Sequence, residues 1–226
     1  NISKVNKFYG ELTGIYWMWK NIANNMDQND KIGNCHYRKF WLNDLFLQKQ
    51  KFSTQNIYTN LLNKDNPKIF SNKNIQVQPI IFKEKSLLSD FYEIHKSDIL
   101  EQSINFLAPK YQLKFRKHLD DNFFFPLNMF ITTVKEFNNY CEILFPWLEE
   151  CFEICQKQNL CKNYNTRLPA FLAERFTSFW FSQDEDKIEL SYARLGKYLL
   201  SNSLNSILNP LKIPFSFRMY PTIHRY

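Results

Sequence analysis

The sequence predicts an α/β fold in which helices outnumber strands. Residues 8–24 have the apolar spacing of a helix, and a polar linker and a short strand from Lys31 follow them, which is the order of an αβ unit. Two further strand-like stretches, residues 75–82 and 123–133, lie among segments with helical spacing. The 226 residues fit a single domain, 1–226, that is long enough to bury a substantial core.

The first predicted helix has one apolar stripe, formed by Ile15, Met18, Trp19 and Ile22. Glu11 lies near its start, where exposed backbone amides favour a negative charge. The strand that follows, from Lys31 to Cys35, is expected to end in a turn.

Four polar side chains come directly after this strand, namely His36, Tyr37, Arg38 and Lys39. In α/β proteins, ligands bind outside the carboxyl ends of the strands. Arginine offers a planar fork to two phosphate oxygens, while histidine and tyrosine donate or accept hydrogen bonds. The stretch therefore predicts a site for a phosphorylated, sugar-like ligand. The alternative interpretation is a surface turn with a basic flank.

Residues 42–122 predict several short elements. Helices are expected over residues 42–50, 86–95, 97–107 and 112–119. The strand-like stretch 75–82 has a proline near its middle, which points to a sheet edge or a bulge.

The stretch 123–133 is rich in phenylalanine and predicts a buried strand with Asn128 in its middle. A buried asparagine needs partners for its amide, so Asn128 is either a structural clamp or a ligand contact. A long helix follows over residues 135–159, with a kink expected at Pro146. Its apolar residues recur at spacings of three and four and are expected in the core.

The segment 167–181 predicts a helix that starts at Pro169 and buries most of its side chains. Glu174 and Arg175 lie in the middle of this apolar segment. A buried carboxylate is costly unless it is paired, and its pKa rises with burial and falls beside a cation. Glu174 is therefore either half of a structural ion pair, with Arg167 or Arg175, or a catalytic base.

Composition limits the classes of ligand. With four glycines, the chain contains neither of the glycine-rich phosphate motifs, GxGxxG or GxxxxGK[ST]. The formal net charge of +7 fits a polyanionic partner, an anionic membrane face or a diphosphate ligand, although genome composition also enriches lysine and asparagine. The lysines are scattered and no nucleic-acid-binding motif is present, so nucleic acid is not an expected partner.

Five cysteines at irregular spacing argue against a disulfide framework and for a reducing compartment. Cys151 and Cys155 lie one helical turn apart, with Cys141 and Cys161 nearby, which raises the question of a metal site. The region has no CxxC pair and no histidine, so small apolar core residues are the better interpretation.

Several ordered blocks of the sequence resemble one known family. Residues 8–21 read FYGELTGIYWMWKN, residues 32–40 read IGNCHYRKF, and later blocks read NMFI, YC with LFP, and an arginine followed by FLAER. These blocks are similar to those of the DUF4422 family of bacterial capsular-polysaccharide and lipopolysaccharide glycosyltransferases. The resemblance spans roughly residues 1–181, which we expect to form the core, with a helical and coil appendage over 182–226.

This resemblance implies an enzyme with a GT-A-like glycosyltransferase fold. It implies transfer of a sugar from a nucleotide-sugar donor, with UDP the commonest nucleotide, to a growing or lipid-linked glycan acceptor. The implied location is the cytoplasm, with peripheral contact at the inner face of the cell membrane. The strand that usually precedes the Glu-Leu-Thr helix is absent, so the fold is expected to lack its first strand. Ala170 also stands where the family usually has glycine.

The resemblance also suggests roles for individual residues. The expected donor-binding residues are His36, Tyr37, Arg38, Glu11 and Asn128, and the expected catalytic residues are Glu174 and Arg175. Arg38 in particular offsets diphosphate charge, because no Asp-x-Asp follows the strand; no metal ligand is assigned, and Mn²⁺ or Mg²⁺ remains an open alternative. Glu174 is the candidate base, with Arg175 or Arg167 setting its pKa. Glu11 and Asn128 orient the sugar or the loop that contains His36.

A second class of function fits the same composition. A non-catalytic glycan-binding or scaffolding subunit of a polysaccharide synthesis complex would also be basic and rich in aromatic rings, because such rings stack on sugars.

Overall fold

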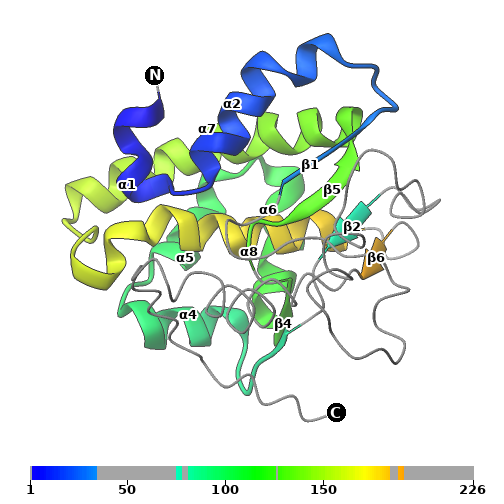
Figure 1. Ribbon diagram of the computed structural model, residues 1–226. Coiled ribbons are helices and arrows are strands. Elements are labelled where there is room, and N and C mark those ends of the chain that lie inside the picture. Colours follow the sequence, from blue (N-terminus) through cyan, green and yellow to red (C-terminus); the bar gives the residue numbers. More distant parts are fainter. Residues whose placement is uncertain (1, 35–74, 78–80, 126, 184–187, 191–226) are drawn as a thin grey trace, which may run out of the picture. The chain divides into compact units, whose positions relative to one another are not determined.

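Helices form most of the described structure and pack against a small mixed sheet (Figure 1). The computed structural model describes residues 2–34, 75–77, 81–125, 127–183 and 188–190, which all belong to one compact unit of the chain. The predicted helix over residues 42–50 lies outside these residues.

The predicted helix over residues 8–24 is divided in the structure. A 3-10 turn (η1, Ile2–Val5) and helix α1 (Asn6–Tyr9) end at Gly10, and helix α2 (Leu12–Asn21) and a second 3-10 turn (η2, Ala23–Asn25) follow. Gly10 has a φ of +53°, a backbone conformation that glycine adopts without steric cost. The expectation of one continuous helix was wrong because the chain turns at this glycine.

The main sheet has four strands in the order β1-β5-β2-β6. They are β1 (Lys31–Gly33), β5 (Phe130–Thr133), β2 (Ile75–Val77) and β6 (Ile188–Leu190). Strand β5 runs antiparallel to both β1 and β2, whereas β2 and β6 are parallel. Because β6 lies beyond residue 181, the sheet includes part of the segment expected to form an appendage.

The predicted strands over 75–82 and 123–133 are each divided between two sheets. Strand β3 (Ile81–Phe82) pairs with β4 (Phe123–Phe124) in a separate two-stranded sheet, away from β2 and β5. Leu127 has a φ of +66° between β4 and β5. Asn128 therefore lies in the connection before β5. The prediction that it lies in the middle of a strand was wrong.

Helices form most of the remaining described residues. They are α4 (Leu87–His95), α5 (Ile99–Gln102), the 3-10 turn η5 (Ser103–Phe106), α6 (Pro109–Asp120), α7 (Val134–Lys157), the 3-10 turn η6 (Asn163–Arg167) and α8 (Leu168–Ser182). Side chains cap the N-termini of two of these helices. The hydroxyls of Ser86 and Thr133 accept hydrogen bonds from backbone amides of α4 and α7, at 3.2 Å in each case.

The core lies where α7 and α8 pack together. The ring of Trp147 on α7 stacks on Phe176 of α8 at 5.0 Å between centroids, and its Nε1 donates to the Ser103 carbonyl at 2.8 Å. Helix α7 continues through Pro146 to Lys157. The core interpretation of the cysteines is confirmed for the buried thiols of Cys141, Cys151 and Cys155. Across the described residues, no helix has the length and apolar character needed to cross a membrane.

One buried histidine makes the stability of this core dependent on pH. His118 on α6 contacts the rings of Phe123 and Phe179, and burial lowers its pKa to about 4. Between pH 6.5 and 4 the unfolded chain binds a proton that the folded chain excludes. The free energy of unfolding should therefore fall with falling pH across this window, by up to about 3 kcal/mol. Urea unfolding at pH 7, 6, 5 and 4.5 measures this slope.

The variant H118L tests the assignment, because it cannot titrate. Its free energy of unfolding should change less with pH than that of the wild type; the slope that remains includes His95, whose pKa burial also lowers. A variant that kept the full slope would contradict a role for His118.

Candidate functional site

Glu11 lies at the break between α1 and α2. It contacts Arg167, which lies 156 residues later in the chain. Nη2 of Arg167 donates to Oε2 of Glu11 at 2.7 Å. A Cβ at residue 10 would lie 2.3 Å from the same Nη2, closer than atoms can approach. Gly10 therefore provides both the turn that presents Glu11 and the space in which the guanidinium lies against the backbone.

Asn128 is almost completely buried and joins Glu11 to helix α8. Its Nδ2 donates to Oε1 of Glu11 at 3.0 Å, and its Oδ1 accepts from the hydroxyl of Thr177 at 2.9 Å. The opposite orientation of the amide would set its oxygen against the Glu11 carboxylate. The carboxylate thus fixes which way the amide faces.

The phenol of Tyr140 completes this chain of hydrogen bonds. Its oxygen lies 2.7 Å from the Thr177 hydroxyl, and burial raises the pKa of Tyr140 well above its ordinary value, so the phenol keeps its proton. The hydroxyl of Thr177 has a single hydrogen and two other acceptors, Oδ1 of Asn128 and the Ala173 carbonyl 2.8 Å away, so this arrangement is best satisfied when Tyr140 donates to the Thr177 oxygen.

The same asparagine holds the end of strand β1. Asn34 donates through Nδ2 to the Asn128 carbonyl, and its Oδ1 accepts from the Phe130 amide at 3.2 Å. A Cβ at Gly33 would lie 2.6 Å from the Phe130 carbonyl oxygen, so glycine is required for this close approach of β1 to β5. The polar network of Glu11, Arg167, Asn128, Thr177, Tyr140 and Asn34 therefore connects α2, α7, α8 and the end of β1.

The structure brings two of the predicted donor-binding residues, Glu11 and Asn128, into direct contact. The other three, His36, Tyr37 and Arg38, lie outside the described residues, two to four positions after Asn34 in the chain.

The predicted catalytic residues, Glu174 and Arg175, form an ion pair on α8. Nη1 of Arg175 donates to Oε2 of Glu174 at 3.2 Å, and Nη2 lies 3.6 Å from Oδ2 of Asp90. The guanidinium lies over the rings of Phe91 and Phe124, at 5.5 Å and 4.7 Å from their centroids. The Arg175 side chain is 5% exposed and that of Glu174 16%.

The sequence left two interpretations of Glu174, a structural ion pair or a catalytic base. The observed contact has the geometry of a structural ion pair in which Arg175 is the cation. Arg167, the other candidate cation, is paired with Glu11. Glu174 and Thr177 lie three residues apart on α8, so the ion pair and the polar network occupy successive turns of one helix.

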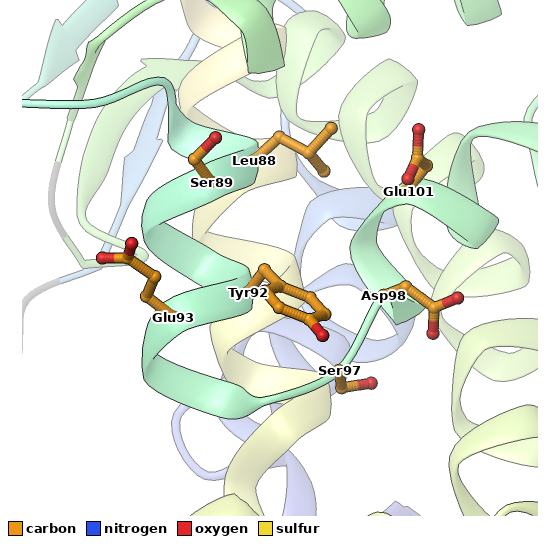
Figure 2. Close-up of a pocket in the computed structure, with 7 residues that line it drawn as sticks. All are labelled: Leu88, Ser89, Tyr92, Glu93, Ser97, Asp98 and Glu101. Atoms are coloured by element: carbon orange, nitrogen blue, oxygen red, sulfur yellow. The ribbon is translucent and has the colours of Figure 1, made fainter.

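A separate hollow of about 320 Å³ lies between α4 and α5. Figure 2 shows Leu88 and Tyr92 from α4 beside this space, with Asp98, just before α5, and Glu101, on α5, across it. It shares no lining residue with the polar network. Among the described residues, no group of three or more histidine, cysteine, aspartate or glutamate side chains could hold a metal ion.

Comparison with known proteins identifies the family. The family DUF4422, described as a domain of unknown function, matches residues 1–185. The chain belongs to the DUF4422 family. The resemblance read from the sequence blocks is therefore confirmed at the level of the family.

One solved structure shares the fold of this DUF4422 chain. It is the apo structure of the bifunctional glycosyltransferase WbbM, with a TM-score of 0.64 and 21% sequence identity. The similarity covers 85% of this chain and 37% of that chain, so the DUF4422 chain spans little more than a third of the solved protein's length. A search of curated proteins found no match.

Sequence reasoning missed several members of the polar network. Asn34, Tyr140 and Thr177 had no assigned polar role, because their partners lie 37 to 96 residues away along the chain. One signal was available: a buried asparagine requires partners, and Glu11, after a glycine in a predicted helix, was a candidate to supply one.

The variant N128D tests the contact between Asn128 and Glu11. The change replaces a donating NH₂ by a carboxylate oxygen that faces the carboxylate of Glu11. At pH 7.5 we expect the free energy of unfolding to fall by roughly 2–4 kcal/mol, and the loss to shrink as the pH approaches 5 and one of the two carboxylates binds a proton. Chemical denaturation at both pH values gives the measurement.

Two further variants separate repulsion from simple loss of hydrogen bonds. N128A removes the bonds without adding a charge, so its deficit relative to the wild type should stay nearly constant with pH. E11Q combined with N128D restores one donor and one carboxylate and should recover part of the stability. Equal deficits for N128D and N128A at both pH values would contradict the contact.

Proposed function

We propose that this protein is a glycosyltransferase with a GT-A-like fold. It moves a sugar from a nucleotide-sugar donor, in which UDP is the nucleotide, to a capsular-polysaccharide or lipopolysaccharide acceptor. The observation that supports this best is the fold shared with part of a bifunctional glycosyltransferase over 85% of this chain. A polar network at the end of strand β1 adds support, because ligands of α/β folds bind beyond the carboxyl ends of strands.

In this proposal, the donor binds beside the polar network. The hydrogen bonds of Asn34 to Asn128 and to the Phe130 amide fix the last described residue before the segment that contains His36, Tyr37 and Arg38. These three side chains bind the donor, and Arg38 offsets the charge of its diphosphate. Glu11 and Asn128 orient the sugar or the segment that contains His36.

Glu174 acts as the general base. The acceptor hydroxyl gives its proton to the Glu174 carboxylate as its oxygen forms a bond to the anomeric carbon of the donor sugar. The bond from that carbon to the diphosphate oxygen breaks, and the nucleoside diphosphate leaves with the electron pair. Arg175 holds the carboxylate in place through the 3.2 Å contact and is itself held between Phe91 and Phe124.

The proposed location is the cytoplasm, at the inner face of the membrane where lipid-linked acceptors are found.

The second candidate function is a non-catalytic glycan-binding or scaffolding subunit. Release of sugar from UDP-sugars by the purified protein, or a rise in its unfolding temperature with UDP, favours the enzyme, and the absence of both favours the subunit. Activity that needs Mn²⁺ or Mg²⁺ and is lost with a chelator would argue against charge compensation by Arg38 alone.

The variant E174Q tests the base. It keeps the size of the side chain and its contact with Arg175 but cannot accept a proton, so turnover should fall by about 100-fold or more. UDP binding should stay close to that of the wild type, while the unfolding temperature should fall, because the neutral amide leaves the buried Arg175 without the charge of Glu174. The measurement is sugar transfer or donor hydrolysis over a panel of nucleotide sugars.

E153Q is the matched control, because Glu153 is an exposed carboxylate on α7 that pairs with Lys157 at 3.4 Å. It should leave turnover unchanged. If E174Q were folded and worked within about twofold of E153Q, Glu174 would not be the base.

A further inference from the structure

Tyr164 in the 3-10 turn η6 presents an aromatic ring to solvent, at 65% exposure. One face of this ring is covered: Phe171 and His95 stack on it, at centroid distances of 5.3 Å and 5.7 Å and interplanar angles of 22° and 14°. The uncovered part of the ring is available to a ligand.

Hydrogen bonds hold this ring in place. Asn165, the next residue, accepts at Oδ1 from Nδ1 of His95 at 2.8 Å and donates from Nδ2 to the His95 carbonyl at 2.9 Å. These bonds fix η6 to the end of α4. The Tyr164 ring is therefore held in place before a ligand binds. Stacking of a ligand on it would cost little conformational entropy.

Arg167 follows Tyr164 by three residues in η6 (Asn163–Arg167). In a 3-10 helix, side chains three residues apart eclipse each other. The Arg167 side chain is 47% exposed and is oriented by Glu11, which binds Nη2 from one side. Its other N–H groups have no acceptor among the described residues. Arg167 is also the N-cap residue of α8, so an anion at this guanidinium would lie near the positive end of that helix.

We propose that Tyr164 and Arg167 form a binding subsite for a diphosphate ester, in which Arg167 binds the phosphate oxygens and Tyr164 stacks on the ring next to them. A flat face beside a diphosphate occurs in a nucleoside diphosphate, through its base, and in a lipid-linked glycan, through its first sugar. The subsite adjoins the polar network, because Glu11 contacts both Arg167 and Asn128. The inference rests on the proposed function, to which it adds a second anchor for a phosphorylated ligand.

The experiment measures binding of three probes by calorimetry. They are UDP, a short-chain alkyl diphosphate that bears one N-acetylhexosamine, and inorganic diphosphate, which has no ring. The test variants are Y164A, R167Q and R167K. The matched controls are Y92A and R116Q, since Tyr92 is 56% exposed and the Arg116 side chain is 42% exposed and also paired with carboxylates.

Y164A should weaken binding of one ring-bearing probe by about tenfold and leave inorganic diphosphate within about twofold. R167Q should weaken that same probe and inorganic diphosphate, each by about tenfold, with R167K between R167Q and the wild type. An effect on UDP assigns the subsite to the donor, and an effect on the alkyl-linked sugar assigns it to the acceptor. The unfolding temperatures of R167Q and R167K show whether loss of the Glu11 contact alone accounts for a change.

The inference is overturned if Y164A and R167Q bind both ring-bearing probes as tightly as Y92A and R116Q do. That result would leave the glycosyltransferase proposal intact, provided that the wild type binds UDP and hydrolyses a UDP-sugar. A different result would overturn the proposed transfer and keep the subsite: the wild type neither binds UDP nor hydrolyses a UDP-sugar, but it binds the alkyl-linked sugar and Y164A weakens that binding.

Discussion

The side-chain amide of Asn128 is the point on which the described structure depends. It is buried, so each of its polar atoms needs a partner, and each unpaired one would cost about 1–3 kcal/mol. Its NH₂ is satisfied by Glu11 and its oxygen by Thr177, while its backbone carbonyl accepts from Asn34. One residue thereby fixes α2, α8 and the end of β1 relative to one another, because no two of these elements can separate without exposing an unpaired group.

Two glycines make this convergence possible. The chain has four glycines in all, and two of them, Gly10 and Gly33, lie where a Cβ would come within 2.3 Å of the Arg167 guanidinium and within 2.6 Å of the Phe130 carbonyl. At both positions another part of the network passes directly over the backbone. Both glycines border the candidate site.

Apolar spacing predicted the helices well, because spacing is local: α4 lies within a segment that the pattern had indicated, and α6, α7 and α8 each overlap such a segment with ends that differ by one to three residues. It failed where one residue decides the path of the chain. The turn at Leu127 separates β4 from β5, and no alternation of side chains reveals it. The partners of Asn128 were also beyond sequence reasoning, since Glu11 is 117 residues away and Thr177 is 49. For Glu174 the sequence offered two cations, and only the packing of Arg175 between Phe91 and Phe124 selected one.

The charges around Arg175 place a condition on Glu174 as a base. Arg175 contacts Glu174 and Asp90, and Asp90 also pairs with Lys83 at 3.1 Å, so two cations and two carboxylates cancel. When Glu174 takes up a proton, this largely buried group gains a net charge of +1, which is unfavourable in a medium of low dielectric constant. Under the proposed mechanism, a leaving diphosphate that gains negative charge in the same step would compensate for it. The ion pair that holds the carboxylate in position would oppose proton uptake by Glu174 when no donor is bound.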